Sequence, residues 1–411
     1  MNLRSKLPTK LRQFATVGAL IKLPLLPPAM LVVGIFILLR PFVIIQVYKV
    51  HDWRIGHMVS TTQRFTYEVR EWNIAHRRKK ICFYFFGSKN SANNYFKNML
   101  IRQHLSLQHN FGFLIFYLSS KIKFLIPETL VQTLDTLGLL SKHQTEIQFT
   151  KTEIDEGNKF LQAFNIALNG KYVCLNVRDD AFLSHTRGIK KFEKHVRRNS
   201  DISTYTRAME CLADMGYVVF RMGSIVQKAL ISENPRIIDY ATNGMRSEFL
   251  DIFLGAHCTF CISTGSGWDE IPRIFNRPLM YVNCLPVIEL NSITQHILLY
   301  PKQQVSINTL RRLSLNEMCS QDLHWQSNTN LFIENGIEIV DLTSSELVTA
   351  VSEMATRVEG KYNPTEHQKS MQEKLRHELR TNPKIQPSPD HYPIRAEFAS
   401  CFLENYPNFL E

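Results

Sequence analysis

The chain has 411 residues, of which 44% are hydrophobic and 21% are charged. This composition excludes a disordered or collagen-like chain, and eight cysteines are too few for a disulfide scaffold. The length predicts two or three domains. The net charge of +11 is uneven, because residues 1–123 hold 19 Lys or Arg and 3 Asp or Glu, a net of +16. This basic part predicts a polyanionic partner, either anionic lipid or nucleic acid.

The N-terminal segment favours lipid. Residues 1–50 carry seven basic side chains and no acid, and the apolar run 29–39 is shorter than the about 20 residues of a spanning helix. No small-residue cleavage motif follows, so a signal peptide is not expected. We expect residues 1–40 to lie on an anionic membrane surface with a short apolar helix inserted; a helix that packs between domains is the alternative. Nucleic acid is not expected, because basic residues do not alternate with aromatics.

The first half alternates weakly between strand and helix. The β-branched run 43–50 predicts a buried strand, and a loop at 51–57 follows it. Residues 81–86 predict a second strand, while 91–109 and 153–168 predict helices.

The second half alternates more clearly. Continuous apolar strands separated by helices predict βαβ units and a parallel sheet with both faces covered. The expected strands are 172–177, 217–222, 237–240, 258–263 and 279–283, and the expected helices are 204–215, 246–254, 268–275 and 361–380.

Absent motifs narrow the chemistry. The sequence has no P-loop, no H-E-x-x-H, no G-x-S-x-G and no D-x-D, so we expect no metal site. Cys258 and Cys261 form one C-x-x-C in a predicted buried strand, where a core role is expected because no second pair is present.

A loop of small residues joins the predicted strand at 258–263 to the predicted helix at 268–275. A parallel strand that leads through glycines into a helix presents backbone N–H groups and a positive dipole end, which suit phosphate. The alternative is a tight turn in which Ser266 or Asp269 caps the helix. The residues predicted to cradle phosphate are Ser263, Thr264, Gly265, Ser266 and Gly267.

Arg178 follows the predicted strand at 172–177. The carboxyl ends of parallel strands open on one edge of a sheet, so we expect Arg178 and the loop 263–267 to converge on a diphosphate. The alternative is a salt bridge with a neighbouring aspartate. Glu270 is expected either to cap its helix or to accept hydrogen bonds from ribose hydroxyls.

Arg54, Gly56 and His57 follow the first predicted strand. Gly56 permits close approach of the backbone to a ligand, and His57 can accept a proton near neutral pH, so His57 is the candidate catalytic base. A structural histidine is the alternative, in which case Asp52 or an acid of the second domain becomes the candidate.

Several motifs, in this order and spacing, resemble a family of bacterial glycosyltransferases found in surface-polysaccharide gene clusters. The resemblance implies a GT-B-like α/β fold, as in fucosyltransferases, with two Rossmann-like domains and a cleft between them. To this fold the charge pattern adds the expected membrane-associated N-terminal helix. The motifs are R-I-G-H (54–57), V-R-D (177–179), R-N-S-D (198–201), R-M-G (221–223), I-D-Y-A (238–241), S-E-F-L-D (247–251), C-I-S-T-G-S-G (261–267) and R-P-L-M-Y-V-N (277–283).

The resemblance implies an acceptor-side domain at 41–168, a nucleotide-sugar-binding domain at 169–350 and a C-terminal helix and tail at 351–411. Arg178 would match the family's diphosphate-binding arginine. We further expect Arg221, together with Glu270, to bind the nucleoside. Arg54 and Gly56 are expected on the acceptor side.

The resulting prediction is a hexosyl- or deoxyhexosyltransferase of surface-polysaccharide assembly, with a nucleotide-sugar donor and a glycan or lipid-linked acceptor. It needs no tightly bound cofactor or metal, because Arg178, the loop amides and the helix dipole can stabilise the departing nucleoside diphosphate. We expect it in the bacterial cytoplasm, peripheral at the inner face of the membrane. The alternatives are a non-catalytic assembly protein that binds glycan or nucleotide, and a sugar-nucleotide epimerase or hydrolase on the same fold.

Overall fold

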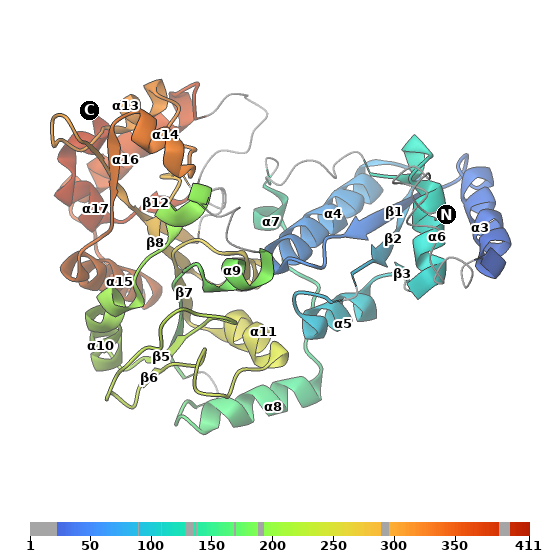
Figure 1. Cartoon of the computed structure of the whole chain (residues 1–411), viewed down its shortest axis with the longest axis horizontal. Coiled ribbons are helices and arrows are strands. Elements are labelled where there is room, and N and C mark those ends of the chain that lie inside the picture. The colour runs from blue at the N-terminus through green and yellow to red at the C-terminus, as the bar shows by residue number, and fades with distance from the viewer. Residues whose placement is uncertain are drawn as a thin grey trace, which may run out of the picture. The chain divides into compact units, whose positions relative to one another are not determined.

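The chain forms two compact units, Met1–Thr133 and Leu134–Glu411. Both are shown in the computed structural model of Figure 1. The residues that the structure describes are 23–88, 90–107, 109–127, 135, 138–167, 170–187, 193–288, 296–385 and 395–411.

The first unit contains a parallel sheet of three strands in the order β1-β2-β3. β1 pairs with β2 along its whole length, from Ile44 opposite Lys80 to Val50 opposite Phe86. The short β3 lies inside the segment 91–109 that the sequence predicts as one helix, because two residues are too few to show a strand period. The elements are β1 (Ile44–Val50), α4 (Ile55–Ala75), β2 (Lys80–Phe86), α5 (Asn94–Gln103), β3 (Ser106–Leu107), α6 (His109–Ser119) and η3 (Lys123–Leu125).

The apolar helix α3 (Leu26–Leu38) packs on this unit by one face only. Ala29, Val33 and Phe36 recur at helical spacing and are buried in a core shared with β1, β2 and α6. The remaining face is apolar and open, with Leu31 67% and Leu38 76% exposed. Among the described residues, no helix has both the length and the apolar character needed to cross a bilayer. Five of the seven basic side chains expected at the membrane belong to residues 1–22, outside the described part.

The second unit is built on a sheet of seven strands in the order β12-β9-β8-β7-β4-β5-β6, in which every pair is parallel. From β6 to β9 this is the doubly wound order 3-2-1-4-5-6, so the topological switch point lies between β4 and β7. The strands are β4 (Tyr172–Asn176), β5 (Val218–Arg221), β6 (Ile237–Ile238), β7 (Phe260–Ser263), β8 (Leu279–Cys284), β9 (Ile297–Pro301) and β12 (Glu397–Phe398).

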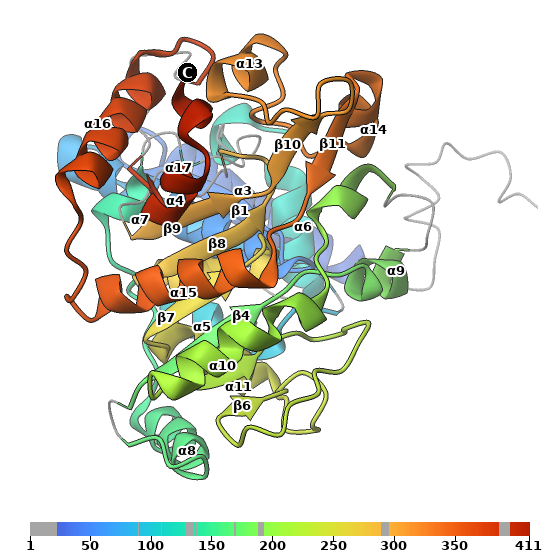
Figure 2. The ribbon, with the colours of Figure 1, turned by 90° about the vertical axis from the view of Figure 1, so that its left-hand side faces the viewer.

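Helices cover this sheet, and α10 and α15 lie side by side on one face (Figure 2). Every residue of β4, β5, β7, β8 and β9 is buried, as the continuous apolar runs predict for a parallel sheet. The helices and 3₁₀ turns include α8 (Lys151–Gln162), α9 (Ala181–Arg187), η6 (Glu193–Arg198), η7 (Ile202–Tyr205), α10 (Thr206–Asp214), α11 (Glu248–His257), η8 (Gly267–Asp269), α12 (Glu270–Ile274), α14 (Thr329–Glu334), α15 (Ser344–Val358) and α16 (Glu366–Thr381).

The expected domain boundary at 168/169 differs from the observed one. Helix α8 belongs to the second unit, where Gly157 lies so close to Phe253 that a Cβ atom would come within 2.1 Å of the ring. The pattern of a helix does not reveal which core it packs on. The C-terminal residues are also part of this unit rather than a separate tail, because β12 extends the sheet beside β9.

The second unit also contains a second, smaller sheet that was not predicted from the sequence. β10 pairs antiparallel with β11, from Gln303 opposite Val340 to Ser306 opposite Ile337. It lies in the region after β9, near three helical segments. These elements are β10 (Gln303–Ser306), α13 (Leu315–Ser320), β11 (Ile337–Val340), α17 (Ser400–Asn405) and η9 (Pro407–Leu410). Cys258 and Cys261 are buried and free, in agreement with a core role.

Candidate functional site

The strands β4 and β7 end side by side at the switch point of the large sheet, with Asn176 opposite Ser263. Just beyond, the Arg178 N–H donates to the Thr264 hydroxyl over 2.8 Å, and the Thr264 N–H donates to the Asn176 carbonyl over 3.2 Å. The predicted meeting of Arg178 with the loop 263–267 is therefore present in the structure. Its role in binding diphosphate stays a prediction.

The loop is organised by a buried carboxylate beneath it. Asp269 accepts hydrogen bonds from the Ser263 hydroxyl at 2.7 Å and from the Ser266 N–H at 2.5 Å. The Ser266 hydroxyl in turn accepts from the Trp268 N–H at 3.2 Å, which completes a capping box. Burial raises the pKa of Asp269 to about 6, against the opposing effect of these hydrogen bonds.

The loop expected to cradle phosphate is thus held by its own hydrogen bonds, and its role in binding phosphate stays a prediction. The hydroxyls of Ser263, Thr264 and Ser266 all have protein partners, and these bonds fix the conformation of the loop. The expected helix at 268–275 is a 3₁₀ turn followed by a five-residue α12, too short for a large dipole. Gly265 has a φ of 89°, which a side chain would strain, and Gly267 is exposed at the surface.

A second arginine, which the sequence analysis did not single out, lies on the same loop. Arg198 donates to the Gly265 carbonyl over 3.3 Å, and its Nε is buried without a partner among the described residues. The next residue, Asn199, accepts from Arg178 Nε at 3.4 Å, and the Ser200 N–H donates to the Arg178 carbonyl at 3.0 Å. The motif R-N-S-D is thus hydrogen-bonded to the residue that follows the end of β4. The arginine of this motif is the sequence feature from which its place in the site could have been predicted.

The aspartates after Arg178 have partners of their own. Asp179 accepts from the N–H groups of Ala181 and Gln227, and Asp180 accepts from the side chain of Asn199. These contacts hold the β4–α9 connection in place around Arg178.

A buried lysine adds positive charge behind this edge of the sheet. Lys302, at the end of β9, donates to the Asn199 carbonyl at 2.6 Å and to Asp341 at 2.5 Å. Burial lowers the pKa of Lys302, while Asp341 acts to raise it and Arg197 acts to lower it. Cations of three segments, Arg178, Arg198 and Lys302, therefore lie at the carboxyl edge of the sheet.

The two residues expected to bind the nucleoside are occupied elsewhere. Glu270 is buried and forms an ion pair with Arg273 at 2.6 Å, one helical turn later. Arg221 is almost fully buried, pairs with Asp239 at 2.9 Å and donates to the Lys228 carbonyl. In the structure both side chains are buried and bonded to other protein groups, so their role in binding a nucleoside stays a prediction.

In the first unit, the motif R-I-G-H begins a helix. The predicted loop 51–57 is shorter than expected, since α4 starts at Ile55 with Arg54 as its N-cap and with Gly56 and His57 in the first turn. Arg54 lies 3.2 Å from His57 Nε2. A guanidinium only donates, so His57 Nε2 accepts and carries a lone pair in this arrangement. That is the protonation state that a general base requires.

Asp52, the reserve candidate for the base, is a structural residue of the first unit. It is buried, accepts from the Ser88 hydroxyl at 2.5 Å and forms an ion pair with Lys97 at 3.4 Å. These contacts tie the loop after β1 to the loop after β2. No group of three or more metal-ligating side chains occurs in the part of the chain that the structure describes.

Comparisons with known proteins return remote similarities. No known protein family and no curated protein matches the chain. One similar solved structure is the E. coli ADP-heptose lps heptosyltransferase II, with 12% identity and a TM-score of 0.42 over 77% of this chain and 100% of that chain. Another is a glycosyl transferase of family 9 from Veillonella parvula DSM 2008, with 8% identity and a TM-score of 0.43 over 77% of this chain and 98% of that one. The functional proposal rests on the geometry of the site.

Proposed function

We propose that the chain is a GT-B-type glycosyltransferase. It moves a hexosyl or deoxyhexosyl group from a nucleotide-sugar donor to a glycan or lipid-linked acceptor in bacterial surface-polysaccharide assembly. The observation that carries the proposal is the meeting of Arg178, Arg198 and the loop 263–267 at the switch point between β4 and β7. Open α/β sheets bind their ligands at this point, and arginines match phosphate oxygens with a planar pair of donors.

The same residues suit the chemistry of sugar transfer. When the bond between the sugar and the diphosphate breaks, negative charge grows on the departing diphosphate. Arg178 and Arg198 are fixed by hydrogen bonds before the reaction, so they stabilise that charge with little reorganisation. The buried Lys302 adds to the field from behind. We propose that this set of cations makes a tightly bound metal or cofactor unnecessary.

We assign the role of base to His57. Its Nε2 takes the proton of an acceptor hydroxyl while that oxygen bonds to the anomeric carbon and the nucleoside diphosphate leaves. Arg54 moves from Nε2 when the acceptor hydroxyl takes its place. Arg54 and Gly56 then line the acceptor side.

A peripheral position at the inner face of the cytoplasmic membrane completes the proposal. The open face of α3 is apolar, and Phe42 in the turn after it is 79% exposed, a feature that suits insertion among lipid headgroups. The nearby cations suit anionic lipid and a lipid-linked acceptor. A cavity of about 300 Å³ beside Phe36 holds four of them around a single acid, Glu68; the four cations are Arg40, Arg78, Lys80 and Lys123.

A single assay tests the proposal against its rivals. Purified protein is incubated with UDP-, GDP-, CMP- and dTDP-sugars, with and without a bacterial membrane extract, and nucleotide release is followed. If the protein transfers sugar, nucleotide release depends on the extract and is strongly reduced in Arg178→Ala. Release or sugar isomerisation without an acceptor would instead indicate a hydrolase or an epimerase. Thermal stabilisation by a nucleotide-sugar without turnover would indicate a binding protein.

A further inference from the structure

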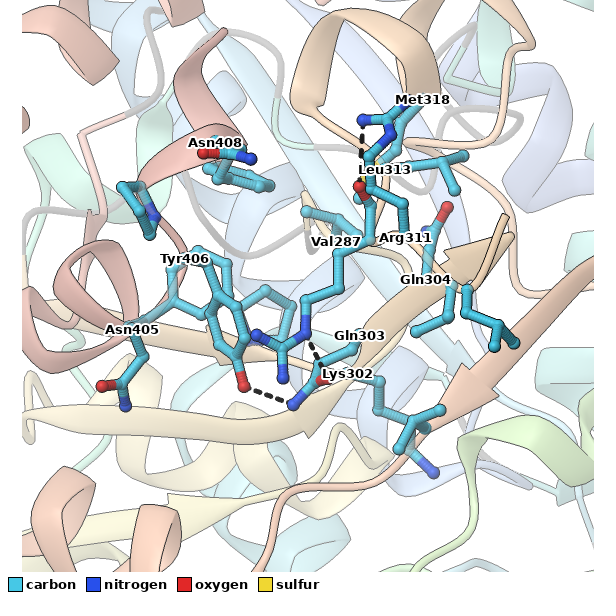
Figure 3. A pocket seen from close by; sticks show the side chains of 18 residues that line it. Val287, Lys302, Gln303, Gln304, Arg311, Leu313, Met318, Asn405, Tyr406 and Asn408 are labelled. Carbon is cyan, nitrogen blue, oxygen red and sulfur yellow. Dashed lines mark hydrogen bonds between the residues drawn. The ribbon is translucent and has the colours of Figure 1, made fainter. Parts of the chain in front are cut away.

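A cavity of about 480 Å³ lies in the second unit, beyond the end of β9 (Figure 3). Its walls come from β10, the segment 310–313, α13, α17 and η9. The volume falls in the range of about 300–1,000 Å³ that small-molecule sites occupy. The walls are mainly apolar and include Leu313, Met318 and Phe402.

One polar side chain in this cavity is unsatisfied. Gln304 is fully buried, and neither its amide nitrogen nor its oxygen has a hydrogen-bond partner among the described residues. A buried, unpaired carboxamide destabilises a fold, so a ligand that pairs with it would remove that cost.

The preceding residue shows the contrast. Gln303 also lines the cavity, but its oxygen accepts from Arg312 Nε at 2.8 Å and its nitrogen donates to Glu346 at 3.3 Å and to the Tyr406 hydroxyl. Figure 3 shows the bonded Gln303 next to Tyr406. The unpaired state of Gln304 is therefore specific to that position.

The charge of the cavity is positive. Its lining holds Lys302, Arg311 and Arg312, and no acidic side chain among the described residues. Arg311 pairs with Glu317, and Lys302 with Asp341. Arg312 differs, because within the described part of the chain no carboxylate lies at ion-pair distance from it. Its guanidinium instead stacks on Tyr406 with 3.9 Å to the ring centre, and the residue is exposed.

We propose that this cavity binds a nucleotide through its base and its phosphate. The Gln304 carboxamide offers a donor beside an acceptor, and the edge of a nucleobase presents the complementary pair. The apolar walls suit the faces of a flat heterocycle, and Arg312 suits a phosphate. An acyl chain would leave Gln304 unpaired, and a bare sugar would bring hydroxyls against the apolar walls.

Two sources can supply such a ligand. Lys302 lines the cavity, and its Nζ donates to the main-chain carbonyl of Asn199, whose side-chain oxygen accepts from Arg178 Nε. Lys302 and Asn199 thus link the cavity to the candidate diphosphate site at Arg178. The ligand is either the nucleoside end of the donor or a separate regulatory nucleotide.

The test uses calorimetry and thermal unfolding of the full chain with AMP, GMP, UMP and CMP and with the matching nucleosides. We expect at least one mononucleotide to bind. Gln304→Met should weaken that binding at least about tenfold, the effect of one lost polar contact, and yet raise Tm because the unpaired amide is gone. Gln303→Met, the matched control, should lower Tm, since it breaks satisfied bonds.

A second variant keeps the test independent of core repacking. The wild type should bind the nucleoside about tenfold or more weakly than the mononucleotide. Arg312→Ala should bind the two with nearly equal affinity, because loss of the phosphate and loss of Arg312 remove the same contact. Equal mononucleotide affinity in Gln304→Met and wild type, or no binding of any of the four to the wild type, would overturn the inference.

Arg178→Ala separates the two sources and the two proposals. Loss of mononucleotide binding in both Arg178→Ala and Gln304→Met would place the nucleoside of the donor in the cavity. Loss in Gln304→Met alone would indicate a separate nucleotide. Loss in Arg178→Ala alone overturns the cavity inference and leaves the proposed function standing.

Discussion

The main-chain N–H of Arg178 donates to the side-chain hydroxyl of Thr264 over 2.8 Å, and so joins two strand ends that are 86 residues apart in the sequence. Thr264 is fully buried, so the bond is shielded from water. The position of Arg178 thus depends on the loop 263–267, together with which it is predicted to bind diphosphate.

The first prediction concerns Arg178 itself. Arg178→Ala should weaken nucleotide-sugar binding by about 1.5–3 kcal/mol, or about 10- to 150-fold, because a charged hydrogen bond to phosphate is lost. Arg178→Lys should also weaken it, since an ammonium cannot bind two oxygens in a plane. Calorimetry measures both. Arg236→Ala, an exposed arginine that donates to the Gly216 carbonyl, is the control and should bind normally.

The second prediction concerns the bond between the two strand ends. Thr264→Val keeps the shape of the side chain but removes the oxygen, which leaves the Arg178 N–H without its acceptor. We expect a loss of about 1–3 kcal/mol in the free energy of unfolding in urea. Thr264→Ser retains the hydroxyl and should lose less. Equal stability of the two variants would contradict a structural role for this bond.

The third prediction concerns Asp269, whose pKa burial raises to about 6 from an ordinary value of 3.8. The folded state then holds this proton more tightly than the unfolded state. Its stabilising contribution is complete below about pH 4 and is lost as pH rises through about 6. Asp269→Asn should remove about 1–3 kcal/mol of this pH dependence, measured by unfolding at pH 4, 5, 6 and 7. The exposed Asp214→Asn should retain the wild-type slope.

The fourth prediction concerns α3. Serine at Leu31 and Leu38 should abolish flotation with vesicles that contain anionic lipid and should leave Tm unchanged, because both side chains are exposed. Val33→Ala should have the opposite profile, with intact flotation and a loss of about 1–3 kcal/mol in stability, because Val33 is buried. Flotation of the double serine variant like the wild type would refute the membrane proposal.

The fifth prediction concerns the base. His57→Ala should lower turnover by about 10²–10⁴ with little change in donor affinity, because only the proton transfer is lost. His76→Ala is the control, since this residue ends the same helix and stacks on Trp72. Near-normal turnover of His57→Ala would assign His57 to a structural role.

The sequence predicted those features that depend on one strand or one turn. The apolar runs located β4, β5, β7 and β8 to within one or two residues at each end. Because parallel strands end on one edge of a sheet, the sequence also predicted correctly that Arg178 lies beside the loop after β7.

The features that depend on tertiary partners were not predictable in this way. The boundary at 168/169 differed because α8 follows the fit of Gly157 against Phe253, which is not a local property. The sequence does not show that Arg221 pairs with Asp239 or that Glu270 pairs with Arg273, because these partners are brought together only by folding. The hydroxyls of Ser263 and Ser266 bond Asp269, which caps the helix as in the alternative interpretation of this loop.

The capping box under the loop also determines how a ligand is received. A glycine-rich loop in solution samples many conformations and would lose that freedom when it closes on a ligand. Here Ser263, Thr264 and Ser266 are already bonded, so the conformational entropy is lost when the protein folds and is not lost a second time on binding. The affinity of the site around the loop 263–267 is therefore determined by its contacts with the ligand, because the conformation of the loop is already formed before the ligand binds.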